Sequence, residues 1–516
     1  MNHRLTSPQL LWSASAILVY LALAKLVLHL VTNFWGGYGD FRDELYYIAC
    51  SNHLDVGYVD QPPLSIYILA LNRWLFGDSL FALRLLPAVS GSFTVLLTGL
   101  MAREMGGGRV AQALAAIACI VSLGFIAMST FYSMNCLDVL FWTLAAYTVI
   151  RLVRDGKARH WVFLGLVLGL GSLNKVGVLW LGGGVFVGTL LTPQRRWLRT
   201  PWPWLGGTLA FMLFSPYIIW NLNHDLAHLE FIRNATAGKY SSLSSLTFLI
   251  GQVMVQNPVA LPIWLAGLWF FFVNRKGRSY QLLGYMYVVP FAILIFNRHS
   301  KPEYLSSAYA ALFAGGAIAF EHWLSRWPLR WLKPTYVTLL TCGLILAPVV
   351  LPILPVETYI RYADALGIKP HSAENKQLSD LPQFYADMFG WEAKAEAVAQ
   401  IYNRLSPEDK AKCAIFGDNY GRCGAIDFFG KAYGLPPSIG KHNNYWIWGR
   451  RDYTGELVIV LGGDLEDKRK AFESVEIAGV STCNYCMPYE NNLRIYVCRN
   501  LKKPLRELWP QLKNYS

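Results

Sequence analysis

Long hydrophobic runs separated by short polar loops dominate the chain from its start to residue 354. A membrane-spanning helix needs about 20 apolar residues, and eleven runs are candidate spans. They lie at residues 10–31, 80–102, 110–129, 137–153, 161–173, 176–192, 203–220, 246–273, 280–296, 305–320 and 335–354. Each run is predicted to be a helix, because a helix satisfies its own backbone hydrogen bonds in lipid.

The polar loops between these runs alternate in charge. Basic loops follow every second run, with Arg103 after the second and Arg151 after the fourth, and the other loops are poor in Lys and Arg. Basic loops stay on the cytoplasmic side, so the N-terminus is predicted in the cytoplasm and residues 355–516 outside. No small-residue cleavage site follows the first run, which is therefore read as an uncleaved span.

The runs at 161–173 and 176–192 are each shorter than a full crossing. Counting them as two spans keeps the basic loops on both sides of the pair in one compartment. The turn Leu173-Asn174-Lys175 between them is then predicted to be recessed from the outer surface.

Residues 355–516 have a different pattern, which predicts a compact α/β domain. Strand-like runs at 413–418, 456–463 and 493–498 follow a polar helical stretch at about 383–404, and a helix-like segment lies at 425–433. The predicted fold class is a polytopic α-helical membrane protein with a C-terminal exported α/β domain. Its domains are 1–354, with a first outer loop at 33–79, and 355–516.

Composition supports this assignment. The chain is 54% hydrophobic and 15% charged, against about 25% charged residues in soluble domains. The net charge of +13 comes from short basic loops, a pattern of membrane topology and not of nucleic-acid binding.

The exported domain holds five cysteines, in a compartment where disulfides persist. Their pairing is left open. The pair Cys483-X-X-Cys486 has the spacing of a redox or zinc pair, but no second pair at zinc spacing accompanies it, so a structural or incidental role is favoured. The five are Cys413, Cys423, Cys483, Cys486 and Cys498.

Polar residues from distant parts of the chain fall on the predicted outer side. Five acids lie within 21 residues of the first outer loop, and Asp138, Lys175 and the loops 221–234 and 297–305 face the same compartment. Ionisable residues at membrane depth tend to line cavities that bind something, so a site is predicted there. The five acids are Asp40, Asp43, Glu44, Asp55 and Asp60.

Each of these residues also has a simpler structural interpretation. Asp43 and Glu44 fit an amphipathic helix on the outer surface, and Asp60-Gln61-Pro62-Pro63 fits the start of a helix. Lys301 fits an anchor at headgroup level, whereas Arg84 and Asp138 fit pairs that fix packing.

The chemistry that suits such a cavity uses one base and several cations. Lys301, Arg298 and Lys175 are candidates to hold the phosphate of a lipid-linked donor, and Asp43 to accept the proton of an attacking hydroxyl. A phosphate leaving group is a weak base, so no general acid is needed.

Several short motifs resemble one family. The first-loop Asp43-Glu44, the sequence DQPP at 60–63, KPEY at 301–304 and FYSMNCLDVLFWTLA at 131–145 resemble the GT-C glycosyltransferases. Specifically, they are similar to bacterial members of family 39, the protein-O-mannosyltransferase-like group, which is related to aminoarabinose transferases acting on lipid A. The resemblance implies a GT-C membrane fold with about 11 transmembrane helices.

The resemblance also implies roles for individual residues. Asp43 would be the catalytic base or an acceptor ligand, with Glu44 beside it, and Asp60 the second acid. Gln61 stands where related transferases often have Lys or His, so Lys301 would carry more of the phosphate binding. Further candidates for binding the donor or substrate, from their position and chemistry, are Arg298, Tyr304, Lys175, Arg84 and Asp138.

A divalent metal is found in some relatives of the group and not in others. If one is present here, its implied ligands are Asp43, His53 and His299. The loops 416–424 and 441–451 are further candidates, for binding an anion and a sugar or headgroup respectively, although an ordinary surface role is slightly favoured for the second.

The expected function is inverting transfer of one sugar from a polyprenyl-phosphate carrier to a glycolipid, glycan or protein acceptor. It is expected at the periplasmic face of a bacterial inner membrane, with membrane lipids and no nucleic acid as partners. The alternative is a transporter or lipid carrier with an outward cavity, which the lack of an internal repeat disfavours. The sugar, the acceptor, metal dependence and oligomeric state are left open.

Overall fold

A computed structural model describes residues 8–325, 331–370, 372 and 374–516. The chain forms two compact units. The helical unit comprises Met1–Gly36, Phe81–Ile218 and Ser242–Leu354. The α/β unit comprises Gly37–Leu80, Ile219–Ser241 and Pro355–Ser516, so it adds two earlier stretches to the domain that the sequence predicts at 355–516.

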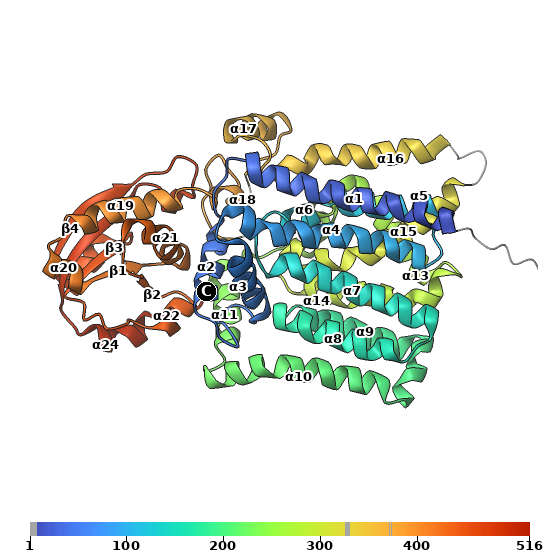
Figure 1. Ribbon diagram of the computed structural model, residues 1–516, viewed down its shortest axis with the longest axis horizontal. Coiled ribbons are helices and arrows are strands. Elements are labelled where there is room, and N and C mark those ends of the chain that lie inside the picture. Colours follow the sequence, from blue (N-terminus) through green and yellow to red (C-terminus); the bar gives the residue numbers. More distant parts are fainter. Residues whose placement is uncertain (1–7, 326–330, 371, 373) are drawn as a thin grey trace, which may run out of the picture. The chain divides into compact units, whose positions relative to one another are not determined.

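All eleven hydrophobic runs coincide with helices or with helices broken in two, as predicted (Figure 1). Six helices in the described part of the chain are long and apolar enough to cross a membrane, or seven with a pair bent by 90°. The protein is therefore a multi-pass membrane protein, and the count of eleven crossings stays a prediction. The helices are α1 (Pro8–Trp35), α4 (Leu80–Glu104), α5 (Arg109–Val121), α6 (Leu123–Met128), α7 (Met134–Asp155), α8 (Arg159–Asn174), α9 (Val178–Leu191), α10 (Trp202–Asn223), α12 (Ser245–Val255), α13 (Leu261–Phe272), α14 (Gln281–Phe296), α15 (Tyr309–Leu324) and α16 (Leu332–Cys342).

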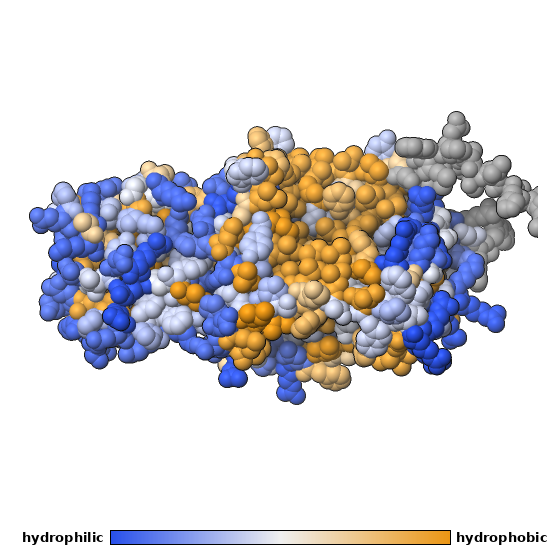
Figure 2. Space-filling view, turned by 60° about the horizontal axis from the view of Figure 1, so that its bottom comes forward, coloured by the Kyte–Doolittle hydropathy of each residue, from blue (hydrophilic) through white to orange (hydrophobic). Residues whose placement is uncertain are grey.

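The helical unit presents a broad apolar surface (Figure 2). Large side chains on α10, such as Phe211 and Met212, are each 64% exposed. Such a surface is stable when lipid covers it, because exposed apolar patches of this extent are rare on soluble proteins.

Polar contacts join several helix ends at one end of the helical unit. Arg154 at the end of α7 ion-pairs with Glu104 at the end of α4. Glu321 near the end of α15 accepts hydrogen bonds from the backbone N–H groups of Gly108 and Val110 at the start of α5, where a carboxylate also complements the helix dipole. Loops that the charge pattern assigns to one side therefore meet at one end, and which side is cytoplasmic stays a prediction.

The predicted break between the two short runs is present. Helix α8 ends at Asn174 and α9 begins at Val178. The Asn174 side-chain amide donates to the carbonyl oxygen of Met134 at 2.9 Å, which fixes the turn against the start of α7. How deep this turn lies in a membrane stays a prediction.

The α/β unit is built on a five-stranded sheet with the order β2-β1-β3-β5-β4. The three strands β2, β1 and β3 are parallel, and β5 and β4 are antiparallel to their neighbours. The predicted strand runs are confirmed as β1, β3 and β5. The strands are β1 (Cys413–Gly417), β2 (Ile439–Gly440), β3 (Leu457–Leu461), β4 (Phe472–Ser481) and β5 (Leu493–Leu501).

Both faces of this sheet are covered. Helix α19 (Trp391–Asn403) and helix α21 (Tyr420–Phe429) supply apolar side chains to the core on one face. Trp509 and Leu505, on α24 (Leu505–Leu508) and the turn after it, pack on the other face. The helices predicted at about 383–404 and at 425–433 correspond to α19 and α21.

The first outer loop contributes two helices to the α/β unit, α2 (Arg42–Asn52) and α3 (Leu64–Phe76). Residues 44–51 of α2 are all buried, and Leu45 packs against Trp391 and Ala425. The interpretation of Asp43 and Glu44 as part of a surface helix is therefore wrong. The helix start predicted at the Pro-Pro pair is confirmed, since Pro63 is the N-cap of α3.

Candidate active site

Two of the predicted acids, Asp43 and Asp60, lie in one cluster of the α/β unit. The hydroxyl of Tyr420 donates to Asp43 Oδ1 at 2.9 Å, and the hydroxyl of Tyr46 donates to Asp60 Oδ1 at 2.9 Å. The rings of the two tyrosines have centroids 4.7 Å apart. Each carboxylate is thus held by one member of an aromatic pair.

Glu44 has a different position from its neighbour. Its carboxylate accepts a hydrogen bond from the backbone N–H of Phe41 at 2.8 Å, the N3 half of a capping box at the start of α2. Glu44 is 1% exposed. This contact gives Glu44 a structural task in fixing α2, and a catalytic role for it stays a prediction.

Burial shifts the titration of Asp60. Removal from water raises the pKa of its carboxyl to about 6, although the Tyr46 hydroxyl and the positive charge of Lys239 act in the opposite direction. The negative charge of Asp43 adds to the increase in pKa. Asp60 therefore changes its charge close to pH 6.

Residues of the C-terminal part complete the cluster. Asn444 Oδ1 accepts hydrogen bonds from the Tyr46 hydroxyl at 3.1 Å and from the backbone N–H of Val59 at 2.8 Å. His442 Nδ1 accepts from the backbone N–H of Tyr420 at 3.3 Å, and its ring stacks on the Tyr420 ring. Burial lowers the pKa of His442 to about 3, so this histidine is neutral.

These contacts were not predicted residue by residue. The sequence identified the loops 416–424 and 441–451 but not Tyr420 or Asn444, and it did not identify Arg42 or Tyr46. Part of this set could have been predicted from the sequence. Arg42 directly precedes Asp43, and the two loops were predicted to bind an anion and a sugar or headgroup.

A pocket of about 290 Å³ adjoins this cluster. Among its described lining residues the cations Arg42, Lys239 and Lys376 outnumber the acid Glu374. Ligand pockets are usually about 300–1,000 Å³, so this one has room for a small polar group. Its other lining residues include Asn419, Tyr420, His442 and Tyr489.

Arg42 links the pocket to the acids. Its guanidinium lies 3.4 Å from Asp387 Oδ2 and 3.4 Å from Asp43 Oδ1. It also donates to the hydroxyl of Tyr489 at 3.2 Å. A side chain with partners on three sides is held in one orientation, and Asp43 is held with it.

The helical unit brings together a second set of predicted residues. Asp138 Oδ2 accepts from the hydroxyl of Ser307 at 2.8 Å and lies 3.4 Å from Lys175 Nζ. Lys175 also donates to Asn135 Oδ1 at 2.8 Å and lies over the ring of Tyr304. The predicted convergence thus holds for Asp138, Lys175 and Tyr304.

The other predicted cations lie on separate segments of this unit. Lys301 is half-buried and directly precedes the short helix Pro302–Ala308, Arg298 is exposed in the same loop, and Arg84 is buried on α4. Gln61 lies in the α/β unit, where its amide is buried and has no hydrogen-bond partner among the described residues. That Asp43 and Asp60 share one cavity with Lys301, Arg298 and Lys175 stays a prediction.

A metal site is not assembled from the described residues. No group of three or more His, Cys, Asp or Glu side chains in the described ranges is placed to hold an ion. His53 Nδ1 lies 3.1 Å from the carbonyl oxygen of Ala49, and its ring stacks on Trp448. The ligand set Asp43, His53 and His299 stays a prediction.

Residues 60–220 match the family described as dolichyl-phosphate-mannose-protein mannosyltransferase. Among curated proteins, the chain is 24% identical over 295 residues to the lipid A galacturonosyltransferase RgtD of Rhizobium johnstonii, covering 56% of this chain and 61% of RgtD. It is 28% identical over 149 residues to the undecaprenyl phosphate-alpha-4-amino-4-deoxy-L-arabinose arabinosyl transferase of Pseudomonas aeruginosa, covering 28% of this chain and 27% of that protein. The matches thus span less than two thirds of these relatives.

Solved structures share the fold over most of the chain. ArnT from Cupriavidus metallidurans, bound to undecaprenyl phosphate, superposes with a TM-score of 0.62 at 14% identity, over 93% of this chain and 97% of that one. The archaeal oligosaccharyltransferase AglB from Archaeoglobus fulgidus gives a TM-score of 0.51 at 12% identity, over 84% and 65%. The resemblance found in the sequence is confirmed to this extent: the chain shares the fold of ArnT and AglB, and part of it is similar in sequence to the aminoarabinose transferases.

Proposed function

We propose that the protein is an inverting glycosyltransferase that moves one sugar from a polyprenyl-phosphate carrier to an acceptor hydroxyl at the periplasmic face of a bacterial inner membrane. The names of the relatives support a transferase and do not favour the transporter alternative. The observation that carries the proposal is the pair of acids, Asp43 and Asp60, each held by one of two adjacent tyrosines beside a cationic pocket.

Asp43 is the base in this proposal. Its side chain is 34% exposed, so a hydroxyl can reach it, and the Tyr420 hydroxyl and Arg42 fix its orientation. The acceptor hydroxyl attacks the anomeric carbon from the side opposite the phosphate and gives its proton to Asp43. The bond between the sugar and the phosphate oxygen breaks, and configuration inverts at that carbon.

The leaving phosphate needs positive charge and no added proton. Lys301, Arg298 and Lys175 are proposed to supply that charge. Gln61 is proposed to donate a hydrogen bond from its amide where relatives often have a cation, and this amide has an unused donor among the described residues. The acceptor is proposed to be lipid A or another glycolipid, a glycan or a protein.

The experiment compares single Asp→Asn variants in purified protein supplied with a polyprenyl-phosphate sugar and a panel of acceptors. Asp43→Asn is expected to lower kcat by about 10²-fold or more, because a general base contributes that much. Asp60→Asn is expected to be impaired as well. Tyr420→Phe is expected to lose less, since it keeps the carboxylate and removes one hydrogen bond.

Asp78→Asn is the matched control in the same loop, since Asp78 pairs with Arg73 at the surface. It should keep the turnover of the unmodified protein. Near-normal turnover in folded Asp43→Asn and Asp60→Asn proteins would overturn the assignment of these acids. Substrate uptake into vesicles without cleavage of the sugar–phosphate bond would favour a transporter instead.

A further inference from the structure

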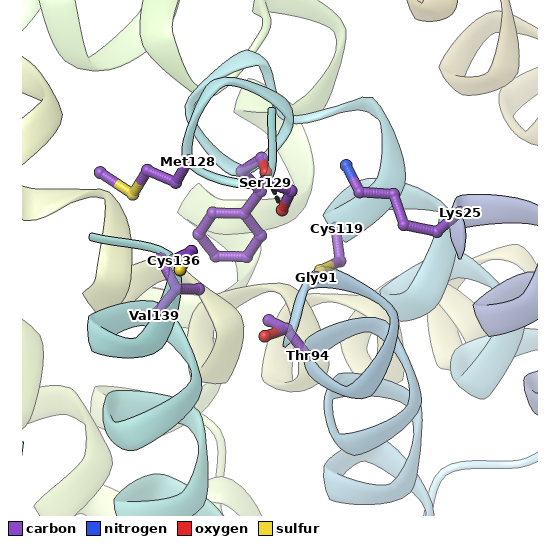
Figure 3. A pocket seen from close by; sticks show the side chains of 9 residues that line it. Lys25, Gly91, Thr94, Cys119, Met128, Ser129, Cys136 and Val139 are labelled. Atoms are coloured by element: carbon purple, nitrogen blue, oxygen red, sulfur yellow. Dashed lines mark hydrogen bonds between the residues drawn. The ribbon is translucent and has the colours of Figure 1, made fainter. Parts of the chain in front are cut away.

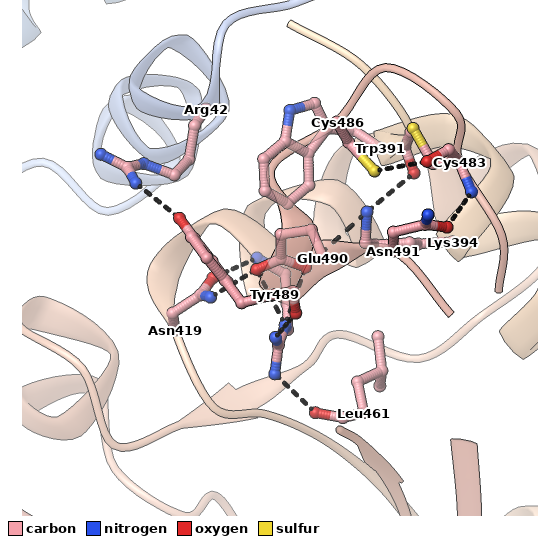
Figure 4. Close-up of polar contacts among 12 residues, drawn as sticks. Arg42, Trp391, Lys394, Asn419, Leu461, Cys483, Cys486, Tyr489, Glu490 and Asn491 are labelled. Carbon is pink, nitrogen blue, oxygen red and sulfur yellow. Dashed lines mark hydrogen bonds and ion pairs between the residues drawn. The ribbon is translucent and has the colours of Figure 1, made fainter. Parts of the chain in front are cut away.

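Cys483 and Cys486 lie in a turn of the α/β unit between β4 and the short helix Pro488–Glu490. Cys486 is 3% exposed, whereas Cys483 is partly open to solvent. The thiol of Cys486 donates to the carbonyl oxygen of Cys483 at 3.2 Å, and the backbone N–H of Cys483 donates to Asn491 Oδ1 at 2.9 Å (Figure 4). The turn therefore holds one accessible and one protected thiol next to each other.

A buried lysine lies beside the accessible thiol. Lys394 is 0% exposed, and a Cβ atom placed on Gly390 would lie 2.8 Å from Cys483 Sγ and 3.1 Å from Lys394 Nζ. The two atoms thus approach the same point above Gly390. A cation at this place stabilises a thiolate at Cys483 over the neutral thiol.

The charges around Lys394 also favour an anion there. Lys394 Nζ lies 3.7 Å from Glu490 Oε2, and Arg422 Nε lies 3.0 Å from the same oxygen. One buried carboxylate therefore balances the charge of two buried cations, which leaves one positive charge without a counter-charge in these ion pairs. A thiolate at Cys483 brings a second negative charge to the cluster, which lowers the cost of burying the cations.

The two thiols differ in acidity as these contacts require. Hydrogen bonding between the two neighbouring cysteine side chains, with help from the positive charge of Lys394, lowers the pKa of Cys483 below its ordinary value. The same interaction and burial raise the pKa of Cys486.

We propose that Cys483 and Cys486 form a redox-active dithiol, in which Cys483 is the attacking thiolate and Cys486 resolves the mixed disulfide. The substrate class is a disulfide, either of a small molecule or of another protein. This inference is independent of the sugar-transfer reaction proposed above.

The reaction is two successive thiol–disulfide exchanges. The Cys483 thiolate attacks one sulfur of the disulfide R–S–S–R, forming a Cys483–S–R bond and releasing one thiolate. The Cys486 thiol then loses its proton to solvent and attacks Cys483 Sγ, forming the Cys483–Cys486 bond and releasing the second thiolate. The dithiol is oxidised by two electrons, and the disulfide is reduced to two thiols.

Other cysteines of the α/β unit lack this arrangement. Cys413, Cys423 and Cys498 are each at most 1% exposed in and against the sheet. Burial raises the pKa of all three thiols. They act as internal controls, because the same reagent meets all these cysteines in one sample.

The test treats the purified full-length protein with oxidised glutathione and maps every thiol by mass spectrometry. The unmodified protein is expected to form the Cys483–Cys486 disulfide and no lasting adduct. Cys486→Ser is expected to keep one glutathione on Cys483, because nothing resolves the mixed disulfide. Cys483→Ser is expected to react at Cys486 at least tenfold more slowly, since Cys486 is buried and protonated.

Four further outcomes bear on the proposal. Equal adduct rates in the two serine variants would overturn it, as would two free thiols at 483 and 486 after treatment with oxidised glutathione and, separately, with a protein disulfide. Faster labelling of Cys413, Cys423 or Cys498 than of Cys483 by iodoacetamide at pH 7 would also overturn it. A protein disulfide that reacts while oxidised glutathione does not would support the proposal and assign a protein substrate.

Discussion

At the residue scale, the two acids Asp43 and Asp60 have different surroundings. Asp43 is partly exposed and next to Arg42, whereas removal from water raises the pKa of Asp60 to about 6. The pH dependence of turnover therefore reports on Asp60.

Turnover is expected to fall as pH drops through about 6, because protonation removes the negative charge of Asp60. At pH 5 the ionised fraction of a group with this pKa is roughly a tenth, so kcat/KM should be about tenfold below its plateau.

The contribution of Asp60 to folding stability should fall as pH rises, whereas turnover rises. The folded state binds the proton more tightly than the unfolded state, so Asp60 favours folding below its unfolded pKa, and this contribution is lost as pH rises through 6.

The measurement is a pH–rate profile of the unmodified protein and of Asp60→Asn. The variant should lack the step near pH 6, and it should gain stability relative to the unmodified protein as pH rises from 4 to 7. A step that persists unchanged in Asp60→Asn would assign the titration to another group.

Lys25 poses a separate problem at the same scale. It is 1% exposed on α1, and its Nζ has no hydrogen-bond partner in the described part of the chain. It lies at a cavity of about 10 Å³ near Ser129 and Cys119 (Figure 3), which holds one water at most.

Lys25→Met is expected to raise the free energy of unfolding by about 1–3 kcal/mol, the usual cost of an unpaired buried polar group. Methionine fills nearly the same space without a polar atom. Thermal unfolding in detergent measures the change, with Lys157→Met at an exposed position as the control. A lower melting temperature in Lys25→Met than in the control would show that the amine stabilises the fold.

At the element scale, the sequence predicted the helices and the central strands because each depends on a local pattern. The runs at 413–418, 456–463 and 493–498 are apolar and largely buried in the sheet. Strand β4 was missed because it is an edge strand whose side chains are mostly exposed or half-buried. No local apolar signal marks such a strand.

The break between α5 and α6 shows a second limit. The sequence predicts one run at 110–129, yet Ser122 ends α5 and caps α6 by accepting from the backbone N–H of Phe125. Its hydroxyl donates to Gln256 Oε1 at 2.8 Å. A partner 134 residues away decides this boundary, and no local pattern contains it.

Helix packing in the helical unit gives a prediction with a matched control. A Cβ on Gly206 of α10 would lie 2.4 Å from the carbonyl oxygen of Trp161 on α8, whereas a Cβ on Gly207 would meet nothing within 4 Å. Small residues allow such close approach between helices in membranes. Gly206→Ala is therefore expected to cost about 1–3 kcal/mol through overpacking, and Gly207→Ala to be neutral or stabilising.

Unfolding of the two variants in one detergent measures the difference. Equal melting temperatures would mean that α8 and α10 are not packed this closely. Because the two glycines are neighbours in one helix, a general effect of alanine on α10 would appear in both proteins.

At the scale of the whole molecule, the sequence predicted the central strands and helices of the α/β unit but not all the chain segments that belong to it. Residues 355–516 carry the sheet as expected, but Gly37–Leu80 and Ile219–Ser241 belong to the same compact unit. The ion pair of Arg42 with Asp387 and the hydrogen bond of Tyr420 to Asp43 join residues more than three hundred positions apart. Contacts at such separation leave no trace in periodicity or composition.

A substitution at Leu45 tests whether the first outer loop is part of the α/β unit. Leu45 is 0% exposed on α2 and packs against Trp391 and Ala425, so Leu45→Ala should leave a cavity and cost about 2–5 kcal/mol. The loss should appear in α19 and α21, which come more than three hundred residues later in the chain. Leu54→Ala is the control, since Leu54 lies in the same loop and is 57% exposed. Faster amide hydrogen exchange in both helices for Leu45→Ala, and not for Leu54→Ala, is the expected result. Unchanged exchange would mean that residues 355–516 hold together without the first loop, and the acids Asp43 and Asp60 would then need another anchor.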